Sequence, residues 1–250
     1  MRFQPLSLKK LISAFVAGVI VFSGSAINSQ TAGASETEVS TAYGSMSFQF
    51  PDVAFDATGN CITPSFNVEV KSSIPSSDWY VDITIRKSGQ SPTGSEGRAY
   101  GTNSGVAAGT IQICPSLDGV GVFIVDGVFT TYENSTNKSL EKSFVSSVNV
   151  RKGISTLMLN TLKRSGSNIS LTGKVTGNTE KYGIVGLSGS VKVDYQLKNS
   201  KKWIALTNTY IGKSGDFKIS VVKKLPKSIL FRVKFEGNDS MEASEVSKSA

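Results

Sequence analysis

Residues 191–197 read VKVDYQL and residues 229–235 read ILFRVKF. In both runs an apolar side chain occupies every second position, and charged or amide side chains fill most of the positions between. A period of two is typical of a strand that buries one face and exposes the other. Residues 199–202 (NSKK) precede Trp203 and predict a turn. The stretch 191–236 therefore predicts a sheet with one buried and one wet face.

The rest of the chain carries shorter runs of the same kind. Glycine, serine and threonine are plentiful and no long helical pattern occurs, which favours many short strands joined by turns. The alternation is cleanest in residues 79–86 (WYVDITIR). We also expect strands over 43–55, 61–71, 110–115, 122–132, 140–150 and 169–175. Residues 35–42 are expected to be flexible, residues 87–109 to be a loop or an irregular sheet edge, and residues 176–189 to be a glycine-rich loop.

The N-terminus has the pattern of a secretory signal. Arg2, Lys9 and Lys10 precede an apolar run, residues 11–22, which is too short for a comfortable membrane span. Small residues follow, and 32–34 (AGA) fits an A-x-A cleavage site, with 25–26 as an earlier candidate. We predict a signal peptide over residues 1–34, export, and no stable membrane span after cleavage; an uncleaved anchor is the alternative.

The two cysteines, Cys61 and Cys114, are predicted to form a disulfide because an exported protein meets an oxidising compartment. Their separation of 53 residues corresponds to a stabilisation of about 4 kcal/mol in the chain-entropy model. Free thiols or a metal pair are the alternatives. Two cysteines in a chain without histidine make a poor metal site.

These observations predict the fold class. A chain of 250 residues is long enough for two domains of about 100 residues each. About seven short strands and a disulfide in the first half match an immunoglobulin-like sandwich, and the order Cys61, Trp79, Cys114 agrees with it. We predict an all-β protein with two immunoglobulin-like β-sandwich domains in tandem after the signal peptide, residues 35–150 and 151–250.

The second half resembles immunoglobulin-like modules of secreted bacterial proteins in the order of its motifs. The matching segments are 155–157 (STL), 169–175 (ISLTGKV), 189–193 (GSVKV), 202–203 (KW), 214–217 (SGDF) and 231–240 (FRVKFEGNDS). Met241 stands where such modules have an aromatic residue, and lysine is more frequent than in them. The first half is similar at the level of fold only. The resemblance implies a spacer or adhesion module outside the cell and brings no catalytic residue with it.

The formal net charge of +8 is unevenly distributed. Residues 1–34 carry three basic and no acidic groups, residues 35–150 carry 6 basic and 12 acidic groups (−6), and residues 151–250 carry 18 and 7 (+11). A basic half fits contact with an anionic polymer or an acidic membrane surface, or attraction between the two halves. The alternative is a solvated surface without a partner, because exposed lysines on strands also prevent edge pairing.

The chain contains no histidine, which excludes Ser-His-Asp and Cys-His nucleophilic sites and every metal site that needs imidazole. The S-x-x-K match at residues 135–138 falls in a polar turn, where ordinary turn composition explains it. Carboxylate pairs remain open, as does calcium binding, although no D-x-D-x-D-G run exists. The candidate carboxylates of the first half are Asp52, Asp56, Asp78, Asp82, Asp118 and Asp126.

Aromatic residues offer a further option, a sugar-binding platform. The tyrosines expected to be exposed are Tyr80, Tyr132, Tyr182 and Tyr210, whereas Trp79 and Trp203 are expected in the core.

Together these features predict a non-enzymatic secreted or cell-envelope-associated protein, a binding, adhesion or spacer module without a cofactor. The expected partner is an anionic cell-envelope polymer or another surface protein. Nucleic acid is excluded by export and by the lack of interleaved aromatic residues. The predicted contact surface is the wet face of the stretch 191–236, with Lys192, Lys198, Arg232 and Lys234. The alternatives are a secreted carboxylate-based hydrolase sited in the first domain, or a purely structural spacer.

Overall fold

The computed structural model describes residues 35–249, and every regular element in that range is a β-strand. The all-β prediction is therefore confirmed. The predicted signal peptide, residues 1–34, lies outside the described residues. No helix in the described part of the chain is long and apolar enough to cross a membrane.

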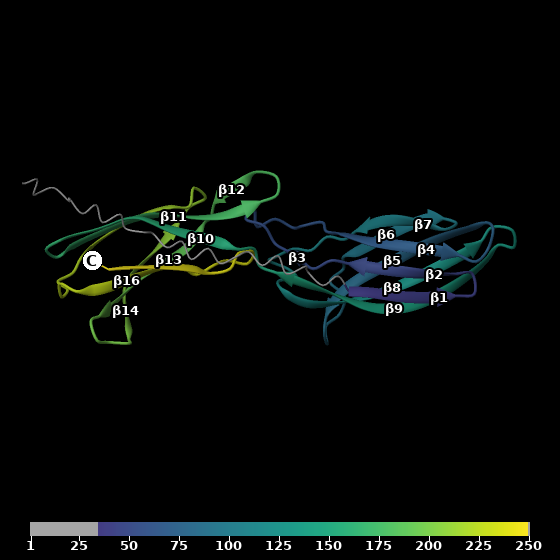
Figure 1. The fold of residues 1–250 in the computed structure, drawn as a ribbon, viewed down its shortest axis with the longest axis horizontal. Helices are drawn as coiled ribbons and strands as arrows, with labels where there is room; N and C mark the ends of the chain where they lie inside the picture. Colours follow the sequence, from purple (N-terminus) through teal and green to yellow (C-terminus); the bar gives the residue numbers. More distant parts are fainter. Residues whose placement is uncertain (1–34, 250) are drawn as a thin grey trace, which may run out of the picture. The chain divides into compact units, whose positions relative to one another are not determined.

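Strands β1 to β9 form two sheets around one core, which we call the first sandwich (Figure 1). One sheet has the order β1-β2-β4-β7, with bounds Ser35–Thr41, Gly44–Phe50, Ser65–Ser72 and Gly105–Thr110. The other has the order β3-β9-β8-β5-β6, with bounds Val53–Ala54, Lys138–Arg151, Gly121–Glu133, Ser77–Lys87 and Glu96–Thr102. Neighbouring strands are antiparallel except β3 and β9, which are parallel.

Alternate residues of these strands build the first core. On β5 every second residue from Trp79 to Ile85 is buried, as the sequence predicts. The ring of Phe48 lies 5.5 Å from that of Phe66 and 5.1 Å from that of Phe144, so aromatic side chains of both sheets meet. Truncating such a ring to alanine lowers the free energy of unfolding by about 3–5 kcal/mol. The contact of Phe48 with Phe144 therefore helps to hold the two sheets together.

Strands β10 to β17 form a second pair of sheets around a second core, the second sandwich (Figure 1). In one sheet β11 (Asn168–Thr179) pairs with β10 (Ser155–Ser165) on one side and with β12 (Gly183–Gly186) and β15 (Asp216–Val222) on the other. The other sheet has the order β14-β13-β16-β17, with bounds Trp203–Ile211, Gly189–Leu197, Ile229–Phe235 and Ser244–Ser249. This is the strand order of an immunoglobulin-like sandwich. The strands of the first sandwich are arranged in a different order within its two sheets.

The stretch 191–236 forms the centre of the second sandwich. On β13 and β16 the odd-numbered residues from Val191 to Tyr195 and from Ile229 to Phe235 are buried, and the even-numbered ones face outward. The two strands are antiparallel neighbours, with Val193 opposite Val233. The turn predicted before Trp203 is present, and Asn199 adopts a positive φ of 67° in it. The period-two prediction is confirmed.

Three segments predicted as flexible, as loop or as irregular edge contain regular strands, and those of 87–109 lie at sheet edges as its edge alternative predicted. Residues 35–42 contain β1, residues 87–109 contain β6 and most of β7, and residues 176–189 contain β12. Gly109 of β7 acts in packing rather than in a turn: a Cβ on it would lie 2.2 Å from the ring of Phe66. The predicted strand 43–55 is also divided, because it ends at Phe50 before Pro51 and resumes as the short β3.

The disulfide between Cys61 and Cys114 is present, which confirms that prediction. Both cysteines lie outside the named strands, so the expected strands 61–71 and 110–115 are wrong at these positions. The cysteines flank an isolated bridge between Ile62 and Ile113, next to the Ser65 end of β4. Trp79 lies near the other end of β4, because Ser77, two residues before it, forms a hydroxyl–hydroxyl hydrogen bond with Ser72. The Cys–Trp–Cys order is therefore a coincidence of sequence.

Candidate functional site

Three of the four basic residues predicted as a contact surface share the outer face of the β14-β13-β16-β17 sheet. Lys192 and Lys234 are opposite each other on β13 and β16, and Arg232 is opposite Asp194. Lys198 follows β13 in the turn before β14. The structure therefore places Lys192, Arg232 and Lys234 together and Lys198 at the end of the sheet.

Acidic side chains compensate much of the positive charge on this face. Lys192 forms an ion pair with Glu236, and this hydrogen bond lowers the pKa of Glu236. The guanidinium of Arg232 donates to Asp194 Oδ2 at 2.6 Å and lies 3.8 Å from Glu245 Oε2. Cations that already have an acidic partner contribute little to attraction of a distant anion, so this face is a weak candidate for a charge-driven contact.

Arg232 has a packing role as well. Its guanidinium carbon lies 4.4 Å from the centre of the Trp203 ring, and its side chain is only 23% exposed. Trp203 is opposite Gln196 on β13, an outward position, so the prediction of a core tryptophan is wrong for Trp203. The reason is non-local: Arg232 covers the indole from β16, two strands away in the sheet. Trp79, in contrast, is buried as predicted.

Most of the charge of the second half gathers at one end of the second sandwich. Antiparallel pairing places Asn168 opposite Val222 and Leu197 opposite Ile229. The β10–β11 turn, the β13–β14 turn and the loop from β15 to β16 therefore meet at this end. We call it the basic pole and define it by nine residues, Lys163, Arg164, Lys198, Lys201, Lys202, Lys223, Lys224, Lys227 and Lys248.

The turns and the loop that form this pole, residues 163–168, 197–203 and 222–230, contain no aspartate or glutamate. Of the 18 basic and 7 acidic residues in 151–250, the remainder of the second half keeps nine basic and all seven acidic ones, a net charge of +2. The basic pole thus holds +9 of the +11. Sequence reasoning located the charge in the correct half but not at this end, because the nine residues come from four separate segments.

Two of the nine basic residues have local partners that shape the basic pole. The guanidinium of Arg164 donates to the carbonyl oxygens of Leu225 and Pro226 and so ties the β15–β16 loop to β10. The ammonium of Lys223 lies 4.9 Å from the centre of the Tyr195 ring. The other seven lysines are exposed. The basic pole therefore presents seven exposed lysines, and two of them, Lys224 and Lys227, lie on the loop that Arg164 holds in place.

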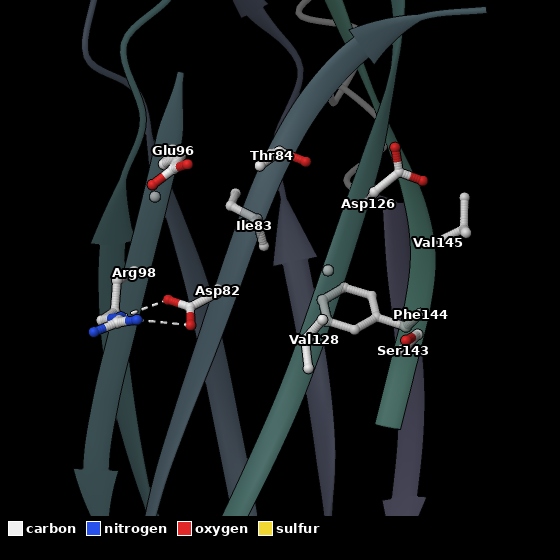
Figure 2. A pocket seen from close by; sticks show the side chains of 12 residues that line it. Asp82, Ile83, Thr84, Glu96, Arg98, Asp126, Val128, Ser143, Phe144 and Val145 are labelled. Carbon is white, nitrogen blue, oxygen red and sulfur yellow. Dashed lines mark hydrogen bonds and ion pairs between the residues drawn. The ribbon is translucent and has the colours of Figure 1, made fainter. Parts of the chain in front are cut away.

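The candidate carboxylates of the first sandwich have structural partners. Asp82 and Asp126 line one hollow on the outer face of the five-stranded sheet (Figure 2). Arg98 holds both oxygens of Asp82 at 2.5 and 2.8 Å, and Arg86 holds those of Asp126 at 2.6 and 3.2 Å. These hydrogen bonds raise the pKa of both arginines, which stay charged. Both carboxylates are therefore engaged in ion pairs with arginine.

The remaining acidic candidates lie elsewhere. Asp52 accepts a hydrogen bond from the Asn149 amide, Asp56 from the Thr58 amide and hydroxyl, and Asp118 from the Cys114 amide. Asp78 lies at the start of β5. Asp126 lies within β8, whereas Asp118 supports a turn after Cys114. Among the described residues no three cysteine, aspartate or glutamate side chains come together as a group that could hold a metal ion.

The aromatic candidates are scattered. Tyr182 and Tyr210 are 64% and 75% exposed, whereas Tyr80 and Tyr132 are partly covered. Tyr100, 76% exposed and opposite Tyr80 on β6, was not among the predicted residues because its strand was expected to be a loop. Arg98 stacks over the Tyr80 ring at 5.2 Å. Tyr80 on β5 and Tyr132 on β8 are diagonal neighbours on the outer face of one sheet, because Tyr80 is opposite Thr130 and Tyr132 is opposite Asp78. Tyr182 and Tyr210 belong to the second sandwich, so the four predicted tyrosines do not form one platform.

Comparisons with known proteins identify no family. No family model matches the chain, and no curated protein matches it. Red sea bream transglutaminase is structurally similar with a TM-score of 0.41 and 9% identity over 83% of this chain and 31% of that one. Domains A168–A170 from titin are similar with a TM-score of 0.24 and 14% identity over 86% and 66%. The chain thus spans about a third of the transglutaminase and just under two thirds of the titin fragment, and the likeness concerns the β-sandwich fold alone.

Proposed function

We propose that this protein is a non-enzymatic binding module, exported and retained at the cell envelope, which contacts an anionic polymer through its second sandwich. The observation that carries the proposal is the basic pole, where nine basic residues meet and the described segments contain no aspartate or glutamate. The Cys61–Cys114 disulfide supports an oxidising compartment. The contact thus moves from the predicted sheet face, where Lys192 and Arg232 are paired, to one end of the sandwich.

Charge density explains why this end suits a polymer. Exposed lysines are mobile point charges and offer no rigid pocket for one small anion. Each lysine near an anionic surface contributes about 1 kcal/mol, so several must act together to hold a ligand. A polymer supplies many anionic groups on one chain and gains from each of them. A carboxylate-based hydrolase has less support, because Asp82 and Asp126 form ion pairs with Arg98 and Arg86.

The test is retention of the purified chain on phosphocellulose, with unmodified cellulose as the neutral control. We expect retention at low salt and release as sodium chloride rises through 0.1 M, where the Debye length is about 10 Å. A variant with Lys198, Lys224 and Lys227 changed to glutamine should elute at lower salt than wild type. Passage of the wild-type chain through the column at low salt, or equal retention on cellulose, contradicts the proposal.

A further inference from the structure

Two grooves flank the basic pole, one on the outer face of each sheet of the second sandwich. The first lies on the β10-β11-β15 sheet and is lined by Lys163, Ser165, Asn168, Ser170, Ser220 and Val222. The second lies on the β13-β16-β17 side and is lined by Gln196, Lys198, Ser200, Ser228, Leu230 and Ser249. Both combine an exposed lysine with serine hydroxyls and an aliphatic wall, and neither contains a carboxylate.

The β15–β16 loop, residues 223–228, connects the two grooves. It leaves β15 beside the first groove, where the Lys223 amide donates to the Ser167 carbonyl oxygen, and it ends at Ser228 in the second. Lys224 and Lys227 are exposed along this crossing. Lys224 and Lys227 therefore place two exposed donors on the loop that links the groove of Lys163 to the groove of Lys198.

From this arrangement we infer that the basic pole binds a linear, phosphate-bearing polymer that crosses from one groove to the other. The inference rests on the function proposed above and adds the ligand class, the path and a minimum length. Phosphate fits because each group presents several acceptor oxygens to a lining that offers lysine and serine donors. The length requirement follows from the spacing of packed sheets, about 10 Å, since the grooves lie on the outer sides of both.

The experiment is calorimetric titration of the full chain at 50 mM salt with inorganic phosphate, tripolyphosphate and long-chain polyphosphate. The two short probes cannot span the sandwich, so we expect them to bind at least 100-fold more weakly per molecule than the long chain. Long-chain binding should weaken about fivefold in Lys163→Gln and about fivefold in Lys198→Gln, the equivalent of ~1 kcal/mol for each lysine. The matched control, Lys213→Gln in the β14–β15 turn at the opposite end, should change Kd less than twofold.

Distinct results separate this inference from the proposed function. If long-chain polyphosphate does not bind even at 50 mM salt, both are overturned. If it binds but Lys163→Gln and Lys198→Gln behave like Lys213→Gln, or if tripolyphosphate binds as tightly as the long chain, the two-groove path is overturned and the proposed function stands. Polyglutamate with the same number of charges should bind more weakly than polyphosphate; equal or tighter binding overturns the assignment to phosphate. Equal urea midpoints for the three variants establish that they are folded.

Discussion

Replacing Arg232 by methionine should separate its structural role from a role in binding. Methionine keeps an unbranched apolar stem but removes the guanidinium, which leaves Asp194 without its principal partner and uncovers Trp203. The side chains of Arg232 and Asp194 are 23% and 16% exposed, so the pair lies between a surface ion pair and a buried one. Surface pairs contribute about 0–1 kcal/mol, and loss of one partner of a buried pair costs about 3–5 kcal/mol.

An intermediate value of about 2 kcal/mol for the ion pair, together with ~0.5 kcal/mol or more for the contact between guanidinium and indole, gives an expected loss of about 2–3 kcal/mol. The assay is urea unfolding followed by tryptophan emission. Trp203 reports on the second sandwich, and Trp79 reports on the first. Asp194→Asn should cost a similar amount, and the double variant should fall short of the sum by about 1 kcal/mol or more because the two residues interact directly.

Retention on an anionic matrix completes this test. Arg232→Met and Lys198→Gln each remove one positive charge, so they are matched in net charge. We expect Lys198→Gln to lower the eluting salt concentration and Arg232→Met to leave it nearly unchanged. A loss of stability below ~0.5 kcal/mol in Arg232→Met, combined with weaker retention than in Lys198→Gln, refutes the structural assignment of Arg232.

Three further predictions concern stability. Reduction of the Cys61–Cys114 disulfide should lower the unfolding free energy of the first sandwich by about 4 kcal/mol, from its 53-residue separation, and leave the Trp203 transition unchanged; equal midpoints with and without reductant would contradict this. Gly109→Ala should cost about 1–3 kcal/mol in urea unfolding, because its Cβ would lie 2.2 Å from a ring carbon of the core, whereas Gly105→Ala on the same strand should be tolerated. The folded-state pKa of Glu236 lies below its ordinary value of 4.5, so its stabilising contribution is present above that value and is lost as pH falls through the folded pKa. Glu236→Gln should therefore flatten the acid side of the stability curve, and an unchanged curve would show that the ion pair contributes nothing.

The local sequence pattern was sufficient for the strands that bury one face. On β5, β13 and β16 the alternation of apolar and polar residues matches the buried and outward positions observed. The disulfide was also predictable, since a chain with two cysteines offers a single pairing. These features depend on composition and on neighbours along the chain, which the sequence displays directly.

Features that depend on distant partners were not predictable. Strand β7 reads GVAAGT, which suggests a loop until the ring of Phe66 is placed against Gly109. A tryptophan in a strand is usually a core residue, and only the contact with Arg232 on another strand explains why Trp203 lies on the outer face. In both cases the deciding contact joins residues that no periodicity links.

The basic pole shows the same limit for the candidate site. Its nine residues fall in the segments 163–164, 198–202, 223–227 and at Lys248, and only the order of the strands brings these together. The alternation instead favoured the outer sheet face with Lys192 and Lys234, where neighbouring carboxylates became visible only from the pairing of β13, β16 and β17. The net charge of the second half could be counted from the sequence, whereas the place where the basic residues gather could be found only from the fold.

The most direct test of the account is the salt dependence of polyphosphate affinity in two triple variants of equal net charge. One carries glutamine at Lys198, Lys224 and Lys227 in the basic pole, and the other carries glutamine at three lysines outside it, Lys174, Lys181 and Lys213. Each phosphate contact contributes about 0.7 to the slope of log Kd against log salt for single-stranded polyanions, so the first variant should lose about 2 units of slope. The second should keep the slope of the wild-type chain. Equal slopes in the two variants would show that net charge alone governs binding and that the basic pole is not the site.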